Sequence, residues 1–482
     1  MSSMVNTLRF KALFGAALGA LVFAAPSAAQ IDPDTTGGAM VARQPSEMDA
    51  AISKWELLQK NGQLGFFDYA GFAMAYPEFP RMEIIRVRAE KTLAVESPSR
   101  TDLLRYFDAL SPLTNPARAR YAVALAGAGR AEALETAREA WRSGTMEEAV
   151  ELTLDSLYGR QLTPADHTAR MDALLWQRDA PAATRHMVNL APTDQPLAMA
   201  RLALVSGARP QDNGLEPPTS AYQDAGYLYS LASYHYAKRS YGEAATILAN
   251  RAEVTGPALD GEKMVGLMLR VAKKASATNA MRIASRIDDL FMPDEDISQG
   301  SFTLRDRYTD LMWLGGTKAL WELGRADQAW PLFERYGKAA RSPLTKAKGF
   351  YWAGRAARAA GNSEESQRLL ETAASWPDYY YGQLALGLLG QPMPQFSALP
   401  RPELTPEQRR EFEARPLSRA ILAIGANRRD WRTERRFFQA IGDGTSDATE
   451  MLMANDLAAR LGMPEMSVVL GFKTGELGYP DL

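Results

Sequence analysis

Residues Leu344–Leu389 read LTKAKGFYWAGRAARAAGNSEESQRLLETAASWPDYYYGQLALGLL, and this stretch decides the fold. Small and apolar residues recur at spacings of three and four before Gly361, a polar acidic segment follows, and a second apolar face then runs to Ala373. Such spacing places one apolar stripe on one face of a helix, and glycine suits the left-handed position that ends a helix. The stretch therefore predicts an antiparallel helical hairpin, followed by a new helix that starts at residues 380–385, Tyr-Tyr-Gly-Gln-Leu-Ala.

The same hairpin pattern recurs along the chain. Gly129 and Gly324 align with Gly361, Gly324 and Gly361 are 37 residues apart, and a degenerate copy spans Tyr227–Asn250. The residues eight, five, four and one positions before the three glycines are Tyr121, Ala124, Leu125 and Ala128; Gly316, Ala319, Leu320 and Leu323; and Ala353, Ala356, Ala357 and Ala360. We expect these residues on one buried face. Because a hairpin with two apolar faces cannot bury both alone, the hairpins must stack. The sequence predicts an all-α fold, an α/α superhelix, and leaves open whether it closes into a ring.

The N-terminus has the pattern of an export signal. Arg9 and Lys11 precede the apolar run Ala12–Ala25, and small residues follow up to Ala29. A charged start, a short apolar run and small residues are typical of a secretory signal peptide, whereas a membrane span needs roughly 20 apolar residues. We therefore expect residues 1–29 to be cleaved off after Ala29, leaving a periplasmic protein without a transmembrane segment.

Composition divides the remaining chain into four segments. Residues 30–47 lack periodicity and predict a flexible N-terminus, and residues 48–390 form the predicted superhelical domain. Residues 391–406 read QPMPQFSALPRPELTP, and prolines at this density cannot continue a helix. We place a domain boundary in this break, and we expect residues 407–482 to form a small helical linker domain.

Composition and charge exclude several kinds of chemistry. The chain has no cysteine, which excludes disulfides, thiol catalysis and cysteine-bound metals. The formal net charge of −2 does not indicate the basic surface that is typical of proteins that bind nucleic acid. The three histidines, His167, His186 and His235, do not stand at metal-ligand spacing, so we predict no metal site and no cofactor.

Two motifs carry a resemblance to a known family. The segments Tyr351–Arg355 (YWAGR) and Tyr380–Ala385 (YYGQLA), together with the export signal, the superhelix, the Pro-rich break and the helical linker, resemble soluble lytic murein transglycosylases. These exported enzymes cleave the glycan strands of peptidoglycan. The resemblance covers essentially the whole chain and implies that the superhelix binds peptidoglycan strands and holds them against a catalytic domain.

The motifs of that catalytic domain are not found. The family carries its catalytic glutamate in a Glu-Ser pair that is followed by Gly-Leu-Met-Gln. Here Glu96-Ser97 precedes a proline, Glu365-Ser366 lies in the first turn of a repeat helix, and Gly266–Leu269 (GLML) has no such pair before it. We assign no catalytic residue. The chain ends at Leu482, shortly after a Tyr-Pro stretch near which the family's catalytic domain begins, so we expect a truncated, noncatalytic portion.

Aromatic residues are the candidates for glycan binding, because aromatic rings stack on the faces of sugars. The candidate residues are Trp352, Tyr379, Tyr380, Tyr381, Tyr234 and Tyr236. The alternative function is a tetratricopeptide-like periplasmic scaffold that binds other cell-wall proteins. A third hypothesis, an enzyme with its glutamate on the superhelix, predicts that residues 30–482 release anhydro-muropeptides.

Overall fold

The computed structural model describes residues 47–395, 403–445 and 447–476. The predicted export signal, nearly all of the predicted flexible segment 30–47, and residues 477–482 lie outside these ranges. Within them the chain forms α-helices, short 3₁₀ turns and one π-turn, and these residues include no strand. The prediction of an all-α fold is therefore confirmed.

The N-terminal half of the described chain contains twelve α-helices. They are α1 (Glu47–Lys60), α2 (Phe66–Ala75), α3 (Met82–Thr92), α4 (Arg100–Ala109), α5 (Asn115–Gly127), α6 (Ala133–Arg142), α7 (Glu148–Tyr158), α8 (Pro164–Gln177), α9 (Ala180–His186), α10 (Gln195–Val205), α11 (Ala225–Ala237) and α12 (Tyr241–Asn250).

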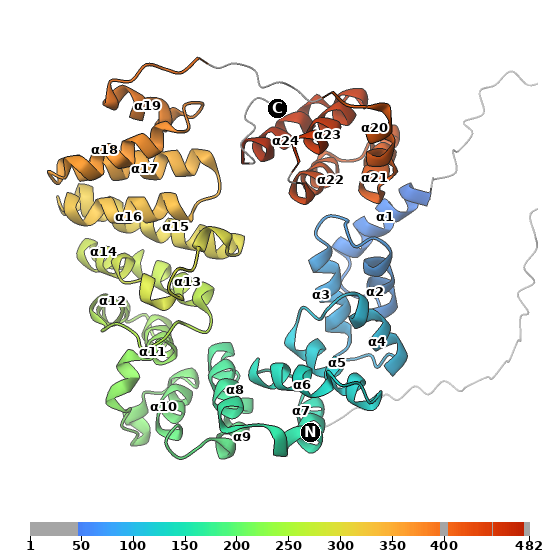
Figure 1. The fold of residues 1–482 in the computed structure, drawn as a ribbon. Coiled ribbons are helices and arrows are strands. Elements are labelled where there is room, and N and C mark those ends of the chain that lie inside the picture. The colour runs from blue at the N-terminus through green and yellow to red at the C-terminus, as the bar shows by residue number, and fades with distance from the viewer. Residues whose placement is uncertain (1–46, 396–402, 446, 477–482) are drawn as a thin grey trace, which may run out of the picture. The chain divides into compact units, whose positions relative to one another are not determined.

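Twelve more follow. They are α13 (Gly261–Ala272), α14 (Ala277–Ser285), α15 (Phe302–Thr317), α16 (Ala326–Ala339), α17 (Pro343–Ala359), α18 (Ser363–Ala374), α19 (Tyr380–Leu389), α20 (Pro406–Ala414), α21 (Pro416–Asn427), α22 (Trp431–Gly444), α23 (Ala448–Arg460) and α24 (Pro464–Glu476). Helices that follow one another in sequence also pack against one another, most extensively from α15 to α19, where Figure 1 shows them stacked in order. The predicted superhelix of stacked hairpins is confirmed.

The aligned glycines end their helices as predicted. Gly129, Gly324 and Gly361 have φ of 67°, 64° and 80°, which is the left-handed region that glycine enters without steric cost. In the degenerate copy, Arg239 takes this position with φ of 61°. The amide of Ser240 then donates to the carbonyl oxygen of His235 at 2.9 Å, so the stop is made without glycine.

The predicted buried face is wrong at its last position. Ala128 and Ala360 are exposed, because each is the C-cap residue at which the helix ends. In the hairpin of Gly324, Leu320 and Leu323 are only half-buried. They lie within and directly after the π-turn Lys318–Glu322, which adds one residue to the helical register.

The last helices pack against the first ones. Phe437 of α22 is fully buried between Trp55 of α1 and Phe79, with ring centroids 5.1 Å from each. Asn427 donates to the Asp49 carboxylate at 2.8 Å, and Arg429 lies 3.6 Å from the same carboxylate. Residues of α20–α24 thus share one core with α1–α5. The separate linker domain and its boundary in 391–406 stay predictions.

No helix in the described ranges combines the length and the apolar character that a membrane crossing requires.

Candidate functional site

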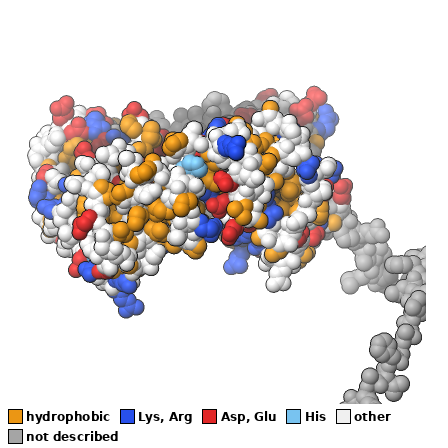
Figure 2. Space-filling model, turned by 90° about the horizontal axis from the view of Figure 1, so that it is seen from below, with side chains coloured by type: hydrophobic (Ala, Val, Ile, Leu, Met, Phe, Trp, Pro, Cys, Tyr) orange, Lys and Arg blue, Asp and Glu red, His pale blue; other side chains and the backbone are white. Residues whose placement is uncertain are grey.

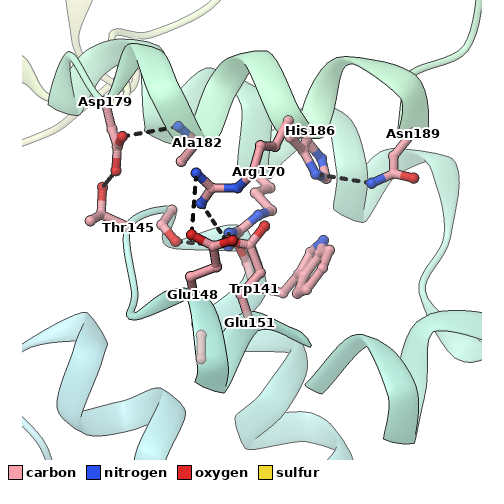
Figure 3. Close-up of polar contacts among 12 residues, drawn as sticks. Trp141, Thr145, Glu148, Glu151, Arg170, Asp179, Ala182, His186 and Asn189 are labelled. Carbon is pink, nitrogen blue, oxygen red and sulfur yellow. Dashed lines mark hydrogen bonds and ion pairs between the residues drawn. The ribbon is translucent and has the colours of Figure 1, made fainter. Parts of the chain in front are cut away.

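A buried polar cluster joins α6, α7, α8 and α9 (Figure 3). The Arg170 guanidinium is fully buried, 3.0 Å from the Glu151 carboxylate and 4.4 Å from the centroid of the Trp141 ring. Arg170 also donates to the carbonyl oxygen of Gly144 at 2.7 Å. A second cation, Arg185, lies 3.3 Å from Glu151. The cluster therefore connects consecutive repeats through a buried ion pair.

Two of the three histidines belong to this cluster. The His186 Nε2–H donates to the carbonyl oxygen of His167 at 3.0 Å. The amide of Asn189 donates to His186 Nδ1 at 3.3 Å (Figure 3). Burial and the nearby Arg170 lower the pKa of His186 to about 4, and burial also lowers the pKa of His167. Both imidazoles are thus neutral at neutral pH. The described part of the chain holds no group of three His, Asp or Glu side chains that could bind a metal ion. We interpret the cluster as structural.

A continuous aromatic surface lies on α15, the π-turn, α16, α17 and α19. Its residues, which we call the aromatic surface, are Trp313, Trp321, Tyr336, Tyr351, Trp352, Tyr380 and Tyr381. Successive rings touch edge to face or tilted, with centroid distances from 5.1 to 6.5 Å. Aromatic pairs favour these geometries. The surface therefore brings together three of the predicted glycan-binding residues, Trp352, Tyr380 and Tyr381.

The π-turn presents Trp321 to solvent. The amide of Leu323 donates to the carbonyl oxygen of Lys318 at 3.1 Å, and that of Arg325 donates to Ala319 at 2.8 Å. One extra residue rotates the side chains after it by about 100° relative to a regular helix, and such turns are frequent at functional sites. Trp321 is 55% exposed, with its ring centroid 5.1 Å from that of Trp352.

Exposure divides the aromatic surface into a platform and a support. Trp321 and Tyr380 are exposed, and Trp313, Tyr336, Trp352 and Tyr381 are half-buried. Tyr351 is buried beneath them. Rings held from below with one face or edge in water can stack on a flat apolar ligand without first losing conformational freedom.

The two sequence motifs meet at this surface. The centroids of the Tyr351 and Tyr381 rings, one from each motif, are 5.5 Å apart. The second motif requires a glycine at position 382, because a Cβ there would lie 1.9 Å from the carbonyl oxygen of Trp376. Only glycine lets the start of α19 approach that turn closely enough to place Tyr380 and Tyr381 on the surface.

Two cations complete the surface. Lys348 Nζ lies 3.5 Å from the centroid of the Trp313 ring and 5.4 Å from that of Tyr336. The Arg355 guanidinium lies 4.8 Å from the centroid of Trp352. Burial lowers the pKa of Lys348 and raises the pKa of Tyr336 to about 12. The site is therefore an aromatic platform that carries positive charge.

Two of the other predicted residues, Tyr234 and Tyr236, lie elsewhere. Tyr234 and Tyr236 lie on α11, where Tyr234 contacts His235 and Tyr236 contacts Tyr241. Tyr379 is the half-buried residue that precedes α19. The sequence analysis did not include Trp313, Trp321 and Tyr336. The repeat alignment assigned no role to the two tryptophans, and the π-turn that exposes Trp321 has no signature in that alignment.

A hollow without comparable aromatic lining lies between α8 and α10. A cavity of about 830 Å³ lies between α8 and α10, with Met171, Leu175 and Leu197 on its walls and Asp172 and Arg201 among its polar groups. On the face seen in Figure 2, apolar side chains are interspersed with charges of both signs. This part of the molecule has no dominant charge that would select a ligand.

The Glu-Ser pairs have ordinary structural partners. The Glu365 carboxylate lies 2.5 Å from the Arg368 guanidinium, and the Glu96 carboxylate accepts from the amide of Phe66 at 3.0 Å. Gly266–Leu269 is buried within α13. Both carboxylates are thus engaged by donors within the described chain.

The fold and the aromatic surface define a helical solenoid with an exposed aromatic platform. No family model matches the sequence, and no curated protein matches it. Structures of soluble lytic transglycosylases do match. The inactive mutant of Slt from Pseudomonas aeruginosa is 18% identical, with 90% of this chain and 67% of that chain covered and a TM-score of 0.45.

Two further structures give similar values. The 70-kDa soluble lytic transglycosylase in complex with bulgecin A is 16% identical, with 90% and 66% covered and a TM-score of 0.45. Slt70 from Escherichia coli is 13% identical, with 90% and 66% covered and a TM-score of 0.41. The chain thus spans about two thirds of the length of these proteins.

Proposed function

We propose that this chain is the glycan-binding superhelical portion of a periplasmic lytic transglycosylase, and that the aromatic surface holds peptidoglycan strands. Cleavage with formation of anhydro-muropeptides would need a catalytic domain outside this chain. The observation that carries the proposal is the meeting of the two family-like motifs, through Tyr351 and Tyr381, on one partly exposed aromatic surface.

The chemistry of the surface suits a polysaccharide. The C–H faces of a pyranose ring are apolar, and its hydroxyl groups remain at the edges. Exposed Trp321 and Tyr380 offer apolar ring faces, and the Tyr380 hydroxyl adds a polar group that can bond a sugar hydroxyl. Binding should then be spread along a row of rings rather than enclosed in a pocket.

Co-sedimentation with purified, insoluble peptidoglycan tests this proposal. We expect the wild-type chain to sediment with the polymer and Trp321→Ala to lose about 2 kcal/mol of binding free energy, roughly 30-fold in affinity, as is typical of an aromatic hot spot. Because Trp321 is more than half exposed, its removal should cost little folding stability.

Trp431→Ala is the matched control. Trp431 is 51% exposed, close to the 55% of Trp321, but it lies on α22 outside the aromatic surface. Its removal should leave sedimentation unchanged. Equal losses in the two variants, or a wild-type chain that stays in the supernatant, would contradict the proposal and favour the protein scaffold.

A further inference from the structure

Lys348 and Arg355 have no acidic partner among the residues that the structure describes. Within the described residues, the contacts of Lys348 are with the rings of Trp313 and Tyr336, and those of Arg355 are with the rings of Tyr351 and Trp352. Neighbouring cations on the same stack do find carboxylates. Lys318 lies 2.5 Å from Glu322, Lys273 lies 3.3 Å from Asp310, and Arg335 lies 2.7 Å from Asp288.

The position of Lys348 has an energetic cost that its ring contacts offset only in part. Its ammonium group is partly removed from water, and no carboxylate near it counters the lowering of its pKa. Charges withdrawn from water are normally paired, and stacking on a ring face is a weaker compensation than an ion pair in the same place. An anionic ligand could supply the partner that the described residues do not provide.

A third donor on the same surface lacks an acceptor. Trp352 Nε1–H is buried and makes no hydrogen bond within the described ranges. Unsatisfied buried donors are uncommon in folded proteins and call for an explanation. Lys348, Arg355 and Trp352 thus lie on one helix, α17, and none of them has an oxygen acceptor in the described part of the chain.

The geometry points to an anion-binding subsite formed by Lys348 and Arg355, which selects glycans that carry a carboxylate on every second sugar. Seven residues separate the two cations, which is about 10.5 Å of helical rise and two turns on one face. This rise is comparable to the length of one disaccharide unit in an extended β-linked glycan. The subsite rests on the proposed glycan-binding function, because the aromatic rings would hold the sugars and the two cations would bind the carboxylates of those sugars.

Calorimetric titration with two oligosaccharides of equal length tests the inference. The neutral probe is a β-linked N-acetylglucosamine oligomer, and the acidic probe is a hyaluronan oligomer, which carries one carboxylate per disaccharide. We expect the wild-type chain to bind the acidic probe about tenfold more tightly at low salt, as two surface ion pairs would give, with the preference falling as salt rises.

The double variant Lys348→Gln/Arg355→Gln should lose this preference, so that its affinities for the acidic and the neutral probe lie within about twofold of each other. Retained neutral binding also shows that the variant is folded. Arg358→Gln is the matched control, because Arg358 is an exposed arginine on the same helix, three residues after Arg355. It should keep the preference.

The outcomes separate the two proposals. Equal binding of both probes by the wild-type chain would overturn the anion subsite and leave glycan binding intact. Binding of neither probe would overturn glycan binding itself. Full displacement of the acidic probe by inorganic phosphate at constant ionic strength would overturn the carboxylate assignment and indicate a general anion site.

Discussion

Gly382 offers a sharp test of how the aromatic surface is assembled. In Gly382→Ala, the added Cβ would lie 1.9 Å from the carbonyl oxygen and 2.6 Å from the carbonyl carbon of Trp376. Real Cβ contacts stay above 3.0 Å, so the backbone would have to move by at least 1.1 Å, the difference between 3.0 and 1.9 Å. The clashing atoms belong to the backbone, and no rotamer change can relieve them. We expect the free energy of unfolding to fall by about 3 kcal/mol, near the upper end of the range for an overpacked core.

The same helix supplies the control. A Cβ at Gly387 of α19 meets no atom within 4 Å, so Gly387→Ala adds only helix propensity. That change should stabilise the helix by about 0.5–1 kcal/mol. The same glycine-to-alanine change at two positions five residues apart in one helix should therefore act in opposite directions. The two variants should differ by about 4 kcal/mol in their free energy of unfolding.

Native-state hydrogen exchange of peptides from α18 and α19 is the assay, because stacked repeats open locally and a global midpoint would average the effect. Exchange in α19 should be faster in Gly382→Ala and slower in Gly387→Ala. If both variants shifted exchange in the same direction, or if Gly382→Ala exchanged like the wild type, the close approach at Trp376 would not be what fixes the start of α19.

Three further predictions follow from the fold. Arg239→Gly should relieve left-handed strain of about 1 kcal/mol and slow exchange of the Ser240 amide about fivefold, whereas Arg239→Ala should not. The pKa of His186 is about 4 in the folded chain and near 6.5 in the unfolded chain. The unfolded state therefore binds a proton first as the pH falls, and the free energy of unfolding should drop by about 3 kcal/mol between pH 6.5 and 4. Urea titrations should show that His186→Gln flattens this slope, and an unchanged slope would contradict the reasoning. Phe437→Ala should cost about 3–5 kcal/mol and speed exchange in α1 as well as in α22, unlike Val468→Ala at an exposed position of α24.

The hairpins could be predicted from sequence because their determinants are local. The spacing before Gly129, Gly324 and Gly361 and the glycines themselves act within one or two helical turns, and the structure keeps them. Trp352, Tyr380 and Tyr381 were found through motifs. Trp321 was not, because its exposure depends on a π-turn that inserts one residue without a composition signal.

Contacts between distant parts of the chain left no local pattern to read. Asn427 and Asp49, which form a hydrogen bond, are 378 residues apart. Phe437 reads in sequence as one more apolar residue of a short helix, and nothing in its neighbourhood specifies Trp55 as its partner. The pairing depends on the accumulated geometry of all the repeats between them.

The packing of α21 and α22 on α1 changes where such a solenoid should begin to open. An ordinary repeat array frays from its terminal units, since each of these has a neighbour on one side only. Here α1–α3 are covered by α21–α24 in a shared core. The first and last units therefore have packing neighbours on both sides, as internal repeats do. The smaller apolar clusters lie along α5–α11. In this region, buried ion pairs such as Arg170–Glu151 replace some of the apolar side-chain contacts. We expect limited proteolysis to cut first in the middle of the array, leaving the first and last helices associated as a noncovalent pair.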